Sequence, residues 1–171
     1  MSDSSTSKHE LDFLVESDNI GGVYDRSSHK RAVSAWEYMK EQWFITNTVI
    51  RKVHKILYPL GGSGHYRRVD HCSRGHAVPP GASVYYLMDA YVEEYQHPPS
   101  PYETFRSEYG SARAEAYCKR AHVRFELIHP FESGNGRVGR ILYNWQRVRM
   151  GLPVRVFKNR YRESYYAWFN T

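Results

Sequence analysis

The hydrophobic residues of this chain recur every three or four positions along most of its length, the spacing at which side chains share one face of a helix. The segments with this spacing are 28–43, 46–57, 83–95, 111–128, 138–148 and, more weakly, 161–169. Ser28, Thr46 and Ser83 stand where a hydroxyl group can cap a first helical turn. The pattern predicts a mainly all-α fold.

Two parts of the chain depart from this pattern. Between residues 61 and 82, Gly64 and Gly75 bracket a stretch that ends at Pro79-Pro80, which predicts a short β-hairpin. Residues 1–10 are polar and rich in serine, so we expect a flexible N-terminus followed by one domain over residues 11–171. The hydrophobic spacing in residues 11–28 is too short to assign an element.

Composition narrows the class of protein. A chain of 171 residues with 41% hydrophobic residues can bury the core of one domain. It has no apolar run of about 18 residues and no secretory signal, so we expect a protein of the cytoplasm, of the producing cell or of a host cell, with no membrane partner. Two distant cysteines, Cys72 and Cys118, fit a reducing compartment.

The net charge of +6 favours anionic partners. No nucleic-acid recognition motif accompanies that charge, so we do not expect nucleic acid to be the partner. The chain also lacks the Gly-Lys-Ser/Thr of a P-loop, which excludes that class of ATPase.

The densest chemistry lies in residues 129–140, between two of the predicted helices. His129 is a candidate general base, because the ordinary pKa of histidine is about 6.5. The turn Gly134-Asn135-Gly136 lets backbone N–H groups approach an anion at the start of a helix, and Asn135 adds an amide donor. Arg137 and Arg140 follow one turn later and favour a polyphosphate. The plainer interpretation is a helix–helix turn with surface arginines.

This stretch, His-Pro-Phe-Glu-Ser-Gly-Asn-Gly-Arg-Val-Gly-Arg, resembles the signature of the Fic family (filamentation induced by cAMP), His-Pro-Phe-x-Asp/Glu-Gly-Asn-Gly-Arg-x-x-Arg. Residues 64–69 and 75–80 are similar to the flap of that family, and residues 121–128 to the helix that precedes the signature. The resemblance spans roughly residues 11–169. It implies a Fic-type helical bundle with a short β-hairpin flap near the active site.

The resemblance implies transfer of AMP from ATP to a Ser, Thr or Tyr hydroxyl group of a protein. His129 would be the base, Gly134, Asn135 and Gly136 the anion site, and the two arginines the triphosphate ligands. Asn144 follows on the same helix, where many members present a residue toward the base. The target protein would pair along the flap, at about residues 64–78, and a separate inhibitory protein is a further implied partner.

Ser133 is the one departure from the signature, because the family has an acid there that holds Mg²⁺ (or Mn²⁺). A hydroxyl group is a poorer ligand for a hard cation. Ser133 could bind the metal weakly, Glu132 could replace it, or the site could be slow or inactive. The last case would leave a nucleotide-binding or protein-binding module, and a donor other than ATP (UMP, phosphocholine or phosphate transfer) is a further alternative.

Ser17-Asp18-Asn19-Ile20-Gly21-Gly22 resembles the inhibitory segment of many Fic proteins, Ser/Thr-x-x-x-Glu-Gly. The glutamate of that segment pairs with the second arginine of the signature, and Gly21 replaces it here. The resemblance therefore implies that Arg140 has no internal carboxylate partner. The alternative is a simple glycine-containing turn.

Overall fold

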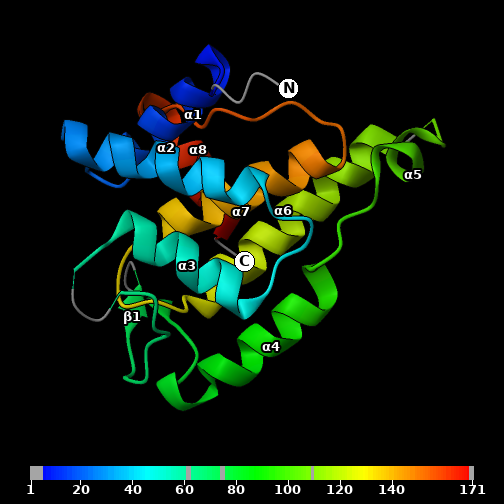
Figure 1. Cartoon of the computed structure of the whole chain (residues 1–171). Coiled ribbons are helices and arrows are strands. Elements are labelled where there is room, and N and C mark those ends of the chain that lie inside the picture. Colours follow the sequence, from blue (N-terminus) through cyan, green and yellow to red (C-terminus); the bar gives the residue numbers. More distant parts are fainter. Residues whose placement is uncertain (1–5, 61–62, 74–75, 109, 170–171) are drawn as a thin grey trace.

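The computed structural model describes residues 6–60, 63–73, 76–108 and 110–169, and these residues are mainly helical (Figure 1). The helices in chain order are α1 (Lys8–Ile20), α2 (Arg26–Lys40), α3 (Asn47–Leu57), α4 (Val84–Tyr95), α5 (Pro101–Phe105), α6 (Gly110–Ile128), α7 (Asn135–Arg149) and α8 (Arg162–Tyr166). None of the helices in the described ranges is long and apolar enough to cross a membrane.

Helices α6 and α7 pack against each other in the middle of the molecule, with α1 and α2 on one side and α4 on the opposite side (Figure 1). The largest buried side chains of the core come from several of these helices. They include Phe13, Trp36, Met39, Tyr91, Phe125 and Trp145, together with Ile50 and Leu57 of α3 and Phe131 of the loop between α6 and α7. The signature loop lies between α6 and α7, so the two central helices hold it from both ends.

The four helices α3, α4, α6 and α7 confirm the elements predicted from the hydrophobic spacing. The Thr46 hydroxyl oxygen caps α3 by accepting a hydrogen bond from Val49 N at 3.1 Å. The start of α2 was predicted wrongly, because the cap is Asp25, whose carboxylate accepts from Ser28 N at 2.8 Å. The same helix ends before Trp43, whose side chain is 74% exposed.

Helix α1 begins inside the segment that we expected to be flexible. Ser7 and Glu10 form a capping box, in which each side chain bonds the backbone N–H of the other residue. Residues 8–10 of that segment are therefore helical, whereas residues 1–5 lie outside the described residues. Phe13 and Leu14 face the core, and this short apolar face is why hydrophobic spacing alone missed the helix.

The predicted hairpin is much shorter in the structure. Strand β1 (Cys72–Ser73) pairs antiparallel with β2 (His76–Ala77) over two residues each, and residues 66–71 form no strand. One reason is Arg67, whose backbone N–H donates to Pro130 O of the signature loop at 2.8 Å instead of to a neighbouring strand. Gly75, which we used to bound the hairpin, lies outside the described residues.

Candidate active site

Most of the predicted site residues line one cavity of about 470 Å³, a volume in the usual range for small ligands. Helices α1, α6, α7 and α8 contribute to its walls. The predicted residues among its lining are His129, Gly134, Asn135, Gly136, Arg137 and Arg140. Gly21, at the end of α1, lines the same cavity.

The N-terminus of α7 opens into this cavity. Gly134 precedes the helix with a φ of 81°, a conformation that strains any residue with a Cβ atom. A Cβ atom there would also lie 2.2 Å from Cε2 of Tyr58, so the ring leaves room only for glycine. Gly134 has no side chain that could cap the helix, and the first backbone N–H groups of α7 have no partner within the helix. These groups and the helix dipole make an anion site.

The side chain of Asn135 shapes the loop instead of serving mainly as a phosphate donor. Its Oδ1 accepts from Phe131 N and its Nδ2 donates to Phe131 O, both at 2.8 Å. The side chain is 2% exposed. This reciprocal pair closes residues 131–135 into a rigid turn, which holds the glycines against the cavity.

His129 lies at the end of α6 in a backbone conformation that residues other than glycine rarely adopt. Its φ is 51°, and its backbone N–H still donates to Phe125 O at 3.0 Å. Such conformations cost about 1–3 kcal/mol and cluster at functional sites. The ring stacks on His71 at 5.3 Å between centroids. The strain therefore turns the imidazole of His129 toward the cavity that it lines.

Arg67 is a site residue that the sequence analysis missed. Its guanidinium group, 2% exposed, donates to four backbone carbonyl oxygens: His129 O (2.7 Å), Ile128 O (3.1 Å), Pro79 O (2.7 Å) and Val69 O (3.0 Å). One side chain thus connects the end of α6 with residues 67–79. An isolated arginine in a loop carries no sequence signal for this role.

His54 holds the other side of the signature loop. Its Nδ1 accepts from Gly64 N at 2.9 Å, and its ring lies parallel to that of Phe131 at 3.9 Å. Burial lowers the pKa of His54, so the ring is neutral and its Nε2–H donates to Ser133 O at 3.2 Å. The sequence analysis assigned no role to this histidine, which turns out to support the loop.

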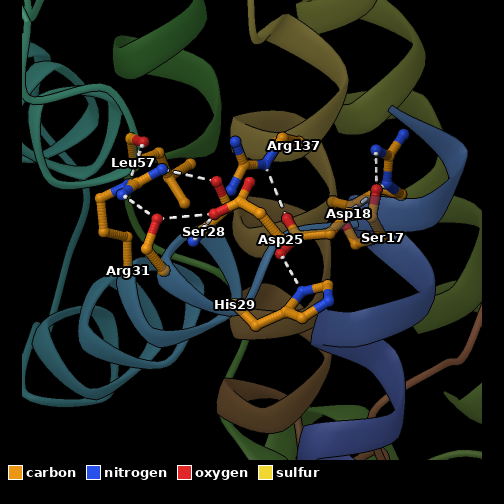
Figure 2. Close-up of polar contacts among 10 residues, drawn as sticks. Ser17, Asp18, Asp25, Ser28, His29, Arg31, Leu57 and Arg137 are labelled. Carbon is orange, nitrogen blue, oxygen red and sulfur yellow. Dashed lines mark hydrogen bonds and ion pairs between the residues drawn. The ribbon is translucent and has the colours of Figure 1, made fainter. Parts of the chain in front are cut away.

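The last turn of α1 contacts both signature arginines. Arg140 donates from Nε to Ser17 Oγ at 2.9 Å and from Nη2 to Ser17 O at 2.8 Å. Arg137 forms an ion pair with Asp18, with 2.7 Å between Nε and Oδ1 (Figure 2). Within the described residues, Arg137 therefore forms an ion pair with a carboxylate, and no ion pair joins a carboxylate to Arg140.

Helix α8 holds Arg140 from the opposite side. The Tyr165 hydroxyl group accepts from Arg140 Nη1 at 3.2 Å and donates to His122 Nε2 at 2.8 Å. Burial, with a smaller contribution from Arg140, lowers the pKa of His122 to about 3, which keeps its ring neutral and able to accept. Arg140 is therefore held between Ser17 of α1 and Tyr165 of α8.

Three residues named in the sequence analysis lie elsewhere. Ser133 and Glu132 line a neighbouring pocket with Arg68 and His65, not the cavity of His129. Asn144 is fully buried, and its amide group bonds both the N–H and the C=O of Arg155. The structure thus gives Asn144 a packing role that fixes the chain after α7.

Comparison with known proteins finds that the model of the Fic/DOC family matches residues 44–146. The protein adenylyltransferase Fic of Aedes aegypti is 29% identical over 129 residues, which cover 73% of this chain and 24% of that protein. The protein adenylyltransferase Fic of Drosophila willistoni is 32% identical over 117 residues, covering 68% of this chain and 21% of that protein. This chain therefore spans about a quarter of the length of the curated relatives that it matches.

Two solved structures show the same fold at low identity. A Fic domain containing signaling protein from Bacteroides thetaiotaomicron matches with a TM-score of 0.73 and 19% identity, covering 94% of this chain and 70% of that chain. Fic-1 from C. elegans matches with a TM-score of 0.72 and 18% identity, covering 98% of this chain and 57% of that chain. The helical architecture around the cavity is thus the one found in these proteins.

Proposed function

This chain belongs to the Fic/DOC family and is distantly related to protein adenylyltransferases, and from that premise we propose that it transfers AMP from ATP to a hydroxyl group of a protein. The observation that carries the proposal is one cavity that contains a histidine, an uncapped helix N-terminus and two arginines. A base and a polyphosphate site within one cavity are what phosphoryl-group chemistry at a hydroxyl group requires.

In the proposed reaction, His129 accepts the proton of the target hydroxyl group. The hydroxyl oxygen attacks the α-phosphorus of ATP, the bond from that phosphorus to the bridging oxygen breaks, and pyrophosphate leaves. The N–H groups of Gly136 and its neighbours bind phosphate oxygens, and Arg137 and Arg140 stabilise the charge that develops on pyrophosphate. The products are AMP esterified to the target, pyrophosphate, and a proton on His129.

A protein-held Mg²⁺ or Mn²⁺ does not fit the residues present. Glu126 and Glu163 are the carboxylates that line the cavity, and the described residues contain no group of three or more His, Cys, Asp or Glu that could hold a metal ion. Ser133, at the position of the family's acid, lines the neighbouring pocket. In this proposal the divalent cation arrives bound to the phosphates of ATP.

We place the target protein along residues 64–78 in this proposal. Val78 lines the cavity, and the His71 ring stacks on that of His129. Residues 65–69 form no helix or strand, so an extended segment of a target could lie beside them and bring its hydroxyl group to His129. A separate inhibitory protein would act by covering the same cavity.

The assay that tests the function supplies ATP labelled either at the α-phosphate or at the γ-phosphate, with Mg²⁺ or Mn²⁺. We expect label from the α-phosphate in protein and none from the γ-phosphate. Label from the γ-phosphate only, or from UTP only, would replace AMP by another donor group within the same reaction class. No label from any of these donors, together with measurable ATP binding, would favour a nucleotide-binding module.

Replacing Ser133 by aspartate should raise incorporation about 10-fold or more, because a carboxylate binds a hard cation better than a hydroxyl group. Ser133 lines the neighbouring pocket but directly precedes Gly134, which lines the cavity, so the gain requires the aspartate side chain to turn toward the phosphate site. Ser63→Asp, a matched change in the neighbouring pocket, is the control. Equal rates for Ser133→Asp and wild type would show that this position does not limit the reaction.

Replacing Gly21 by glutamate should lower incorporation about 10-fold, because a carboxylate there competes with phosphate for the arginines. Gly21 lines the cavity, and a Cβ atom there would lie 3.2 Å from Asp18 O and 3.6 Å from Cγ and Cδ of Arg137, so a side chain can enter if the end of α1 shifts by a few tenths of an ångström. Gly21→Gln has the same length without the charge and serves as the control. An unchanged rate for Gly21→Glu rules the idea out.

A further inference from the structure

Asp18 is a buried carboxylate that the proposed chemistry does not use. Its side chain is 1% exposed, although carboxylates are rarely buried unless they are paired. Oδ1 lies 2.7 Å from Nε of Arg137, and Oδ2 lies 2.7 Å from Nδ1 of His29 (Figure 2). The two oxygen atoms thus have different partners, one on α7 and one on α2.

Arg137 contacts Asp18 and Tyr58, and its guanidinium group still has nitrogen atoms without a hydrogen-bond partner among the described residues. Its side chain is 4% exposed, and its guanidinium carbon lies 5.0 Å from the centroid of the Tyr58 ring. Within the described part of the chain, the buried Nε and Nη2 of this arginine have no hydrogen-bond partner, so the 2.7 Å contact of Nε with Asp18 is an ion pair. A buried N–H group without an acceptor costs free energy, and Arg137 lines the cavity, so an acceptor from a ligand fits there.

The position of the carboxylate decides whether it supports or blocks that ligand. Asp18 contacts Nε, on the edge of the guanidinium group near the helix, and leaves the Nη2 end uncovered. This ion pair and the Tyr58 ring restrain the guanidinium group from two sides. A glutamate that competes with phosphate would instead approach from the cavity side, where Gly21 lies.

We propose that Asp18, oriented by His29, is a positioning residue that holds Arg137 with its Nη2 end toward a bound polyphosphate. The proposal rests on the proposed function to the extent that the polyphosphate is that of a nucleotide. In this chain the last turn of α1 supports phosphate binding through Asp18, at the segment where the resemblance would place an inhibitory glutamate.

Affinity for ATP and for inorganic tripolyphosphate tests this inference separately from transfer. We expect Asp18→Asn to weaken both affinities about 10-fold and to raise the KM for ATP more than it lowers kcat, because Arg137 binds phosphate before the reaction as well as during it. His29→Gln, at a side chain that is 26% exposed, should fold normally and weaken binding by about 2-fold to 3-fold.

Non-additivity distinguishes positioning from general support of the fold. If Asp18 acts through Arg137, Asp18→Asn should have no further effect on affinity in an Arg137→Gln background. The matched control is Glu115→Gln, which also removes a carboxylate from a buried arginine, Arg147, but lies away from the cavity. Its affinity should equal that of wild type.

Three outcomes would overturn the inference: Asp18→Asn and His29→Gln both binding as wild type does, Asp18→Asn binding more tightly, or additive effects in the double variant. Tighter binding would instead make Asp18 an inhibitory residue. A wild-type chain that binds these phosphates in the expected pattern but transfers no AMP would contradict the proposed function alone. A wild-type chain that binds neither compound would contradict both.

Discussion

Replacing His129 by alanine should abolish label transfer from the α-phosphate of ATP. A positioned general base contributes about 100-fold to 10,000-fold to such a reaction, so incorporation should fall by at least 100-fold. ATP affinity should change little, because the anion site at the start of α7 and both arginines remain. Removing the imidazole should also leave the fold intact, which thermal unfolding can verify.

The control for this variant is His97→Ala, since His97 packs against Phe44 and does not line the cavity. Its incorporation should match that of wild type. Incorporation by His129→Ala above one tenth of the wild-type level would mean that another group, or water alone, removes the proton. The mechanism proposed above would then be wrong, whereas the phosphate site could still be correct.

Replacing Arg67 by methionine should have the largest effect on stability of any single change outside the hydrophobic core. Methionine fills a similar space but leaves four backbone carbonyl oxygens without their donor. Each unsatisfied buried group costs about 1–3 kcal/mol, and partial rearrangement offsets some of that cost, so we expect a loss of roughly 3 kcal/mol or more in the free energy of unfolding.

Denaturant unfolding of Arg67→Met measures this loss. Arg68→Met is the matched control, because Arg68 is the next residue and its side chain is exposed. Arg67→Lys should recover only part of the stability, since an ammonium group cannot reach four acceptors in the planar arrangement of a guanidinium group. Equal stability of Arg67→Met and wild type would show that the carbonyl oxygens find other donors.

The spacing of hydrophobic residues and the capping residues predicted those helices whose formation depends on neighbouring residues in the sequence. The spacing of hydrophobic residues identified α3, α4, α6 and α7, and Thr46 marked the start of α3. The same signals failed for α1, whose buried face is short, and for the hairpin, where Arg67 directs the backbone N–H to Pro130. Long-range hydrogen bonds determine such segments, and a pattern within a few residues carries no information about them.

The residues of the candidate site also fall into a group that local sequence predicts and a group that it does not. His129, the glycines and the arginines are contiguous in the sequence, so their common cavity could be predicted from twelve residues. Asp18, His54 and Arg67 act on that loop from distant segments, and each is an ordinary polar residue in its local context. Asn144 shows the opposite case, because its position on α7 suggested the cavity but its amide group binds Arg155.

The contacts of α1 also bear on how such sites diversify. Ser17 and Asp18 hold the two signature arginines from more than a hundred positions away, outside the matched range 44–146. In the proposed mechanism, substitutions in this helix therefore change phosphate affinity while every residue of the signature stays the same. Two chains with identical signatures can then differ in the nucleotide concentration that they need for activity. The residues that catalyse the reaction and the residues that control it can change independently, because they lie on separate segments.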